Sequence, residues 1–134
     1  MLKRTIVVTG ASGFDGGAIL ARGTKSLTAT WIAASRRPVV GLPDGVEWWQ
    51  CGDLGPEANW SRILQSADCL IHTAARVHQM KDHATDPLVE FRRVNAEGTA
   101  RLACQAAECG VRRFIFLSSI KVNGERTRLN HPFG

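Results

Sequence analysis

Short apolar runs alternate with stretches of helical periodicity along this chain. The apolar runs are rich in β-branched and aromatic residues and have the length of buried strands. Strands are therefore predicted at residues 4–9, 28–34, 46–50, 69–72 and 113–117, and helices at residues 14–25, 57–66 and 86–109. Strands that alternate with helices are typical of a parallel sheet with right-handed crossovers. The predicted fold is α/β, a doubly wound parallel sheet of about five strands in the order 3-2-1-4-5.

The longest predicted helix carries one asparagine on its apolar stripe. The stripe follows helical spacing and comprises Leu88, Phe91, Asn95, Gly98 or Thr99, Leu102 and Ala106. An unsatisfied buried amide costs about 1–3 kcal/mol, so Asn95 is expected to have hydrogen-bond partners. Either it braces the ends of the fourth and fifth strands, or it is a satisfied core residue without a chemical role. Gly98 is expected to let the helix approach the sheet closely.

The composition indicates one soluble globular domain. The chain has 134 residues, of which 44% are hydrophobic and 22% are charged. Residues 1–124 are expected to form the domain, and the polar residues 125–134 are expected to be a disordered tail. No apolar run is long enough to span a membrane, and no signal-peptide core precedes the first strand. A cytoplasmic protein without a membrane partner is expected.

The net charge of +5 does not indicate a nucleic-acid partner. The basic residues come as scattered pairs, such as Arg36-Arg37 and Arg112-Arg113, without a recognition-helix, zinc or RNA-binding motif. An anionic cofactor with an anionic substrate accounts for the charge better. The cysteines at positions 51, 69, 104 and 109 form no Cys-x-x-Cys or Cys/His pattern, so no metal site is predicted.

A glycine-rich turn joins the first predicted strand to the first predicted helix. Its glycines stand at positions 10, 13 and 16, directly after the apolar run 5–8. Gly10 permits a tight turn, Gly13 lets backbone N–H groups approach a pyrophosphate, and Gly16 lets the helix lie close to the strand. The helix dipole and the first-turn amides favour a bound phosphate. The turn therefore predicts a dinucleotide site, and the alternative is a glycine-rich turn that binds nothing.

Five segments of the chain resemble, in this order, those of the extended short-chain dehydrogenase/reductases. They are residues 9–16, 53–54, 72–75, 95–99 and 116–124. Within that group the chain is similar to the NAD-dependent epimerase/dehydratase family, which acts on nucleotide sugars. The resemblance covers essentially the whole chain and implies a Rossmann-type domain. The segment 118–124 is most similar to the UDP-N-acetylhexosamine 4-epimerases and 4-dehydrogenases.

The resemblance implies roles for individual residues. Asp53 matches the acid that accepts from the adenine amino group, and Leu54 would donate its backbone N–H. Ser119, with Ser118 as its alternative, aligns with the residue that hydrogen-bonds the sugar hydroxyl being oxidised, and both follow the fifth strand, where ligands of such sheets lie. The candidate cofactor-binding residues are Gly10, Ser12, Gly13, Phe14, Asp15, Gly16, Ser35, Arg36, Asp53, Leu54, Thr73, Ala74, Ala75 and Asn95.

The end of the second predicted strand bears on the choice of cofactor. An NAD site usually offers an acidic residue there for the ribose 2′-hydroxyl. This chain has Ser35-Arg36-Arg37 instead, and a hydroxyl with two guanidiniums suits a 2′-phosphate. NADP is therefore favoured over NAD by a small margin, because many epimerases of this family hold NAD tightly. Arg36 could also stack on the adenine.

The chain contains no tyrosine. In the family that it resembles, a Tyr-x-x-x-Lys pair carries the chemistry, with the lysine lowering the tyrosine pKa. The chain is therefore expected to be the amino-terminal half of a nucleotide-sugar oxidoreductase or epimerase that ends after strand five, and to be inactive alone. The alternatives are a free-standing, non-catalytic dinucleotide-binding or sensor module, and a degenerate fold that binds no cofactor. The uncovered edge of strand five predicts self-association, including a possible homodimer.

Asp15 departs from the family pattern, which usually has an apolar residue before the third glycine of the turn. A carboxylate in the first turn of a helix satisfies the helix dipole. It would also stand close to the pyrophosphate, and like charges oppose each other. Asp15 is therefore expected to weaken cofactor binding.

Overall fold

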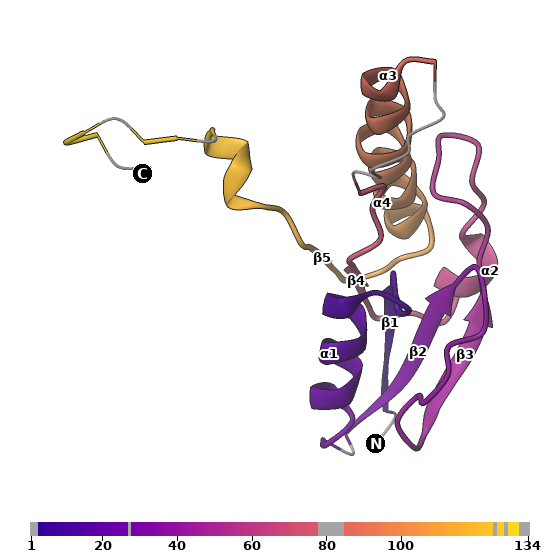
Figure 1. The fold of residues 1–134 in the computed structure, drawn as a ribbon. Helices are drawn as coiled ribbons and strands as arrows, with labels where there is room; N and C mark the ends of the chain where they lie inside the picture. Colours follow the sequence, from indigo (N-terminus) through magenta and orange to yellow (C-terminus); the bar gives the residue numbers. More distant parts are fainter. Residues whose placement is uncertain (1–2, 27, 78–84, 125, 128, 132–134) are drawn as a thin grey trace.

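The computed structural model describes residues 3–26, 28–77, 85–124, 126–127 and 129–131. Its centre is one sheet of parallel strands: β1 (Arg4–Thr9), β2 (Ala29–Ser35), β3 (Val46–Gln50), β4 (Cys69–His72) and β5 (Arg113–Phe116). The strand order is β3-β2-β1-β4-β5, as Figure 1 shows. The predicted α/β fold and the predicted strand order are confirmed.

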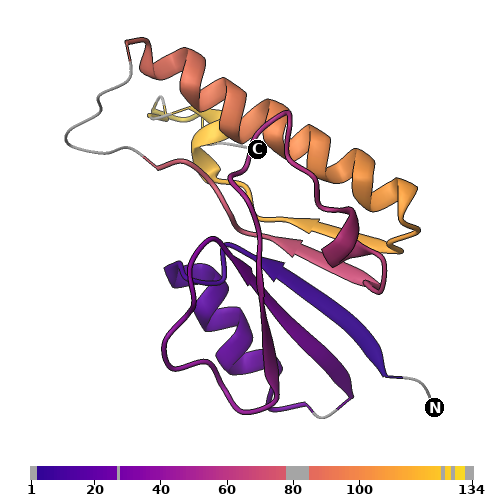
Figure 2. The same cartoon turned by 90° about the vertical axis from the view of Figure 1, so that its right-hand side faces the viewer.

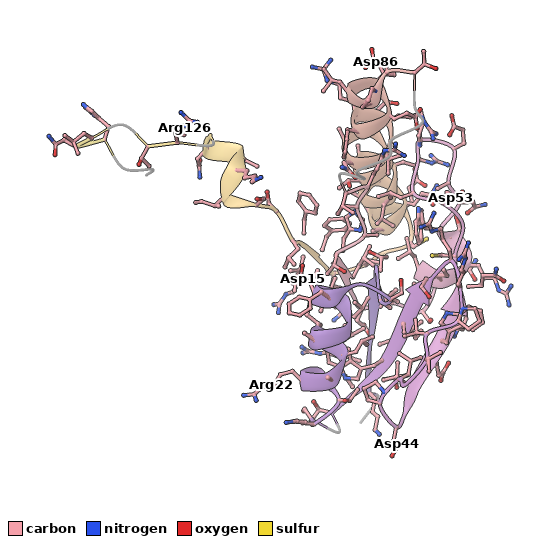
Figure 3. All side chains as sticks on the ribbon, in the orientation of Figure 1. Asp15, Arg22, Asp44, Asp53, Asp86 and Arg126 are labelled. Atoms are coloured by element: carbon pink, nitrogen blue, oxygen red, sulfur yellow. The ribbon has the colours of Figure 1, made fainter. Side chains whose placement is uncertain are left out.

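Helices cover both faces of the sheet (Figure 2). Because successive side chains of a strand point to opposite faces, the fully buried neighbours Val7 and Val8 belong to different cores. Val8 packs with Leu20 of α1 (Phe14–Gly23). Val7 packs in the second core with Leu64 of α2 (Ser61–Leu64) and Leu102 of α4 (Gly98–Glu108). Figure 3 places Asp15 at the end of α1 near the carboxyl ends of the strands and Arg22 at the other end.

The long helix consists of three consecutive segments. Asp86 caps α3 (Pro87–Phe91) by accepting from the backbone N–H groups of Leu88 and Val89, then a π-helix, η1 (Arg92–Glu97), leads into α4. The predicted extent is nearly right, but the uniform 3.6-residue stripe is wrong. Leu88 is 58% exposed, because the wider π turn changes the rotation of everything before it relative to α4.

The second helix is shorter than predicted, four residues rather than ten. The backbone groups just before it are bound by a side chain instead of by a helical turn. Gln105 of α4, which is buried, accepts from Trp60 N at 2.6 Å and donates to Ala58 O at 2.8 Å. This amide therefore ties α4 to the loop after β3, and nothing in the sequence pattern had singled it out.

Gly98 provides a close approach, but not to the sheet as predicted. A Cβ at Gly98 would lie 2.9 Å from the backbone nitrogen of Gly55 and 2.9 Å from Cγ of Leu54. Both neighbours belong to the loop after β3. Gly98 thus lets α4 press against the loop that carries Asp53 and Leu54.

The edge strand β5 leaves apolar side chains exposed. Ile115, Phe116 and Leu117 are 40%, 51% and 43% exposed. The chain then leaves the body through a 3₁₀ helix, η2 (Ile120–Asn123), which Figure 1 shows extending away from the sheet. The predicted disordered tail, residues 125–134, lies partly outside the described residues. No helix in the described part of the chain is long and apolar enough to cross a membrane.

Candidate functional site

A cavity of about 670 Å³ lies at the carboxyl ends of the strands. It is bounded by the glycine-rich turn after β1, by the ends of β2 and β3, and by the segment after β4. The predicted cofactor residues that line it are Gly10, Ser12, Gly13, Phe14, Asp15, Gly16, Ser35, Arg36, Asp53, Leu54, Thr73, Ala74 and Ala75. Four predicted stretches that are far apart in the sequence, residues 10–16, 35–36, 53–54 and 73–75, therefore meet in one place.

The glycine-rich turn has the geometry that its sequence predicts. Gly10 has a φ of +68°, which favours glycine, and a Cβ there would lie 2.6 Å from Ala74 N. A Cβ at Gly16 would meet the carbonyl of Gly10, with the carbon atom 2.9 Å away. The turn is thus packed tightly between β1, α1 and the segment after β4. Ser12 to Asp15, at the start of α1, are exposed and line the cavity. The N–H of Gly13 donates to Gly10 O at 2.9 Å, and the remaining N–H groups of a helix start fit a phosphate.

Thr73 helps to hold this turn in place. Its hydroxyl donates to the carbonyl oxygen of Thr9 at 2.7 Å. Thr73 is one of the candidate cofactor-binding residues from the sequence. The structure places it at the cavity and gives its hydroxyl a role in fixing the end of β1.

The end of β2 holds its polar groups differently from the sequence-based expectation. The Ser35 hydroxyl is buried, donates to Arg37 O at 2.6 Å and accepts from Trp48 Nε1 at 2.9 Å. Its one proton is therefore already used. Arg36 Nη1 donates to Asp53 Oδ1 at 2.9 Å, so the Asp53 carboxylate is part of an ion pair that the sequence did not predict.

Asn95 and the two serines do not line the cavity. Asn95 Oδ1 accepts from Arg76 N at 2.6 Å, and its Nδ2 donates to Arg76 O at 2.9 Å. It therefore braces the segment after β4. These hydrogen bonds do not reach β5, which Asn95 was also expected to brace. Ser119 caps η2 by accepting from Lys121 N, and Ser118 is exposed beside it.

Several further residues line the cavity without a sequence prediction: Cys51, Gly52, Trp60, Arg76, Val77, Glu90, Arg93 and Val94. Arg93 comes from η1 and pairs with Glu90 at 3.2 Å and with Glu57 at 3.6 Å. The i, i+3 spacing of Glu90 and Arg93 was the available signal for this pair. Burial raises the pKa of the Cys51 thiol, which keeps it protonated near neutral pH.

His72 ends β4 and lies beneath the turn. It is fully buried between two hydroxyls, with Nδ1 2.7 Å from Thr9 Oγ1 and Nε2 2.9 Å from Thr99 Oγ1. Burial lowers its pKa to about 4. A neutral imidazole therefore links the end of β1 to the start of α4.

The fold and this cavity together define a Rossmann-type dinucleotide-binding domain. The comparisons agree: the model of the NAD dependent epimerase/dehydratase family matches residues 6–133, and the chain belongs to that family. It is 40% identical to a UDP-glucose 4-epimerase of Vibrio cholerae over 98% of this chain and 40% of the relative. It is 30% identical to a UDP-glucose 4-epimerase of Klebsiella pneumoniae over 92% of this chain and 95% of that protein.

A solved structure, MoeE5 in complex with UDP-glucose and NAD, is similar in sequence and in fold. Its identity to this chain is 28% and its TM-score is 0.71, over 91% of this chain and 38% of MoeE5. The chain thus spans about two fifths of the length of the Vibrio relative and of MoeE5.

Proposed function

We propose that this chain is the amino-terminal, NAD(P)-binding half of a UDP-sugar epimerase, dehydratase or dehydrogenase. The observation that carries the proposal is the convergence of the glycine-rich turn, the ends of β2 and β3, and residues 73–75 on one cavity. The first-turn amides of α1 would hold the pyrophosphate, and the part of the cavity lined by Asp53 would hold the adenine. The relatives' names support a nucleotide-sugar substrate. A cytoplasmic location belongs to the proposal, and the four free cysteines support it.

Titration of the purified chain with NADH tests the cofactor part of this proposal. Binding should enhance the nicotinamide fluorescence in a saturable way. Absence of binding at millimolar NADH and NADPH would overturn it and would favour the degenerate fold.

The chain alone should not turn over a nucleotide sugar. A nicotinamide cofactor would supply hydride transfer, but a base must take the hydroxyl proton, and the chain has no tyrosine for that role. Ser119 is proposed to contact the sugar only when the following part of the enzyme covers η2. An in-frame Tyr-x-x-x-Lys about 20 to 30 residues after Gly134 would support this, as the family resemblance implies. Its absence would favour the non-catalytic module.

NADP is the second candidate cofactor, and Arg36 and Arg37 support it. Both belong to a second hollow at the ends of β2 and β3, which continues the main cavity. The buried Ser35 hydroxyl supports it less, since its proton goes to Arg37 O. Parallel titrations with NADH and NADPH distinguish the two cofactors.

Replacing Asp15 should tighten cofactor binding. Asp15 is exposed at the first turn of α1 and lines the cavity, so its charge opposes that of a pyrophosphate. We expect Asp15→Val to lower the dissociation constant for NADH about threefold, the size of one like-charge contact in a wet site. Asp15→Asn is the matched control, because it removes the charge and keeps the size. Unchanged or weaker binding by both variants would refute the charge argument.

The open edge of β5 should make the isolated chain self-associate. Ile115, Phe116 and Leu117 expose apolar area beside unpaired backbone groups. Sedimentation velocity should show a concentration-dependent shift to dimers or larger species, and Leu117→Lys should reduce it. Val40→Lys is the control, since Val40 is 98% exposed in a loop away from β5. A monodisperse monomer at all concentrations would contradict the prediction.

A further inference from the structure

An ion pair borders the cavity at the ends of β2 and β3. Arg36 follows β2 and Asp53 lies in the loop after β3, and Arg36 Nη1 is 2.9 Å from Asp53 Oδ1. Both side chains are largely exposed, 74% and 81%. The pair borders both the main cavity and the adjoining hollow, which Arg37 and Gln50 also line. Gln50 Nε2 lies 3.3 Å from Arg36 O, which fixes the backbone from which Arg36 extends.

This pair orients the only guanidinium that lines both hollows at the end of β2, among the described residues. A ribose 2′-phosphate at that end requires cationic donors, and a bidentate guanidinium suits it best. The Ser35 hydroxyl gives its proton to Arg37 O, so it offers no donor there. Arg36 is thus a donor for such a phosphate, beside Arg37 of the adjoining hollow, and Asp53 already holds one N–H group of Arg36.

We infer that Asp53 is a positioning residue that sets cofactor preference through Arg36. It holds Arg36 on its own carboxylate and so withholds guanidinium N–H groups from a 2′-phosphate. This weakens binding of a 2′-phosphorylated dinucleotide and leaves a 2′-hydroxyl unaffected. The inference rests on the proposed dinucleotide site, and it adds a function to Asp53 beyond the expected contact with adenine.

The test compares affinities for NADPH and NADH in the Asp53→Asn variant of the full chain. Since both cofactors carry the same adenine, a lost adenine contact lowers both affinities and cancels in their ratio. Because exposed ion pairs are weak, the ratio should move towards NADPH by about fivefold. Asp44→Asn removes the same charge from the opposite end of the sheet, as Figure 3 shows, and should leave the ratio unchanged. The pair 2′,5′-ADP and AMP should give the same result without nicotinamide.

Arg36→Gln distinguishes positioning from simple repulsion. Alone, this variant should move the ratio towards NADH, and Asp53→Asn added to it should change the ratio by less than twofold. An unchanged ratio in Asp53→Asn, or the full change in the Arg36→Gln background, would overturn the inference. Failure of wild-type chain to bind either cofactor would instead overturn the proposed function.

Discussion

Gly16→Ala should unfold the glycine-rich turn and abolish detectable NADH binding. A Cβ at Gly16 would collide with the Gly10 carbonyl and lie 3.0 Å from Ala11 Cα. All these neighbours are backbone atoms, so either the turn or α1 must move. The expected loss is about 2–4 kcal/mol of unfolding free energy. Urea unfolding and NADH titration measure the two effects.

Gly17→Ala is the matched control for this prediction. It adds the same methyl group one residue later in α1, where the nearest atom is Ala11 O at 3.9 Å. Alanine is favoured over glycine inside a helix by about 0.5–1 kcal/mol, so this variant should be slightly more stable. Equal stability and equal binding of the two variants would show that the close contact of Gly16 is not required.

The protein should lose stability as the pH falls from 6.5 towards 4, because of His72. Its pKa is about 4 in the folded protein and 6.5 ordinarily, so the unfolded chain binds more protons in this range. The contribution of the neutral, buried His72 to the unfolding free energy is fully present above pH 6.5 and is lost as the pH falls through about 4. Each tenfold change in proton affinity corresponds to about 1.4 kcal/mol. The unfolding free energy should therefore fall by on the order of 3 kcal/mol over this pH range because of His72.

Unfolding free energies of wild type and His72→Asn at several pH values test this directly. The variant should be less stable at pH 7, since it alters the bonds to Thr9 and Thr99. It should, however, show a shallower dependence of the unfolding free energy on pH between 6.5 and 4, because asparagine does not titrate. The carboxylates titrate in both proteins and do not contribute to the difference. Parallel curves for the two proteins would mean that His72 does not carry the acid sensitivity.

The strands and their order were predictable because their signals are local or topological. Each strand is a short apolar run, and the crossover rule leaves few ways to arrange five of them. The helices were less predictable. The π turn of η1 has no compositional signal, and Gln105 replaces part of the second helix through bonds to Ala58 and Trp60, over 40 residues away.

The site was predictable where one stretch of chain carries its own geometry. The backbone geometry predicted for the glycines at 10 and 16 agrees with the structure, because it is set by the adjoining strand and helix. The hydrogen-bond partners of the side chains could not be predicted in this way, since many of them come from distant segments. Nothing near Arg36 in the sequence points to Asp53, and Ser35 could not be known to donate to Arg37. The serines after β5 remain predictions about a complete enzyme.

The pairing of β1 with β4 has a consequence for synthesis of the chain. Thr9 and His72 are 63 residues apart, so the glycine-rich turn leaves the ribosome well before the segment against which Gly10 packs. At about 5–20 residues per second, β1 waits roughly 3–13 seconds for its second neighbour. During that interval β1, β2 and α1 can already associate, but β1 remains an edge. The cavity at the carboxyl ends of the strands therefore cannot form until residues 73–75 have left the ribosome.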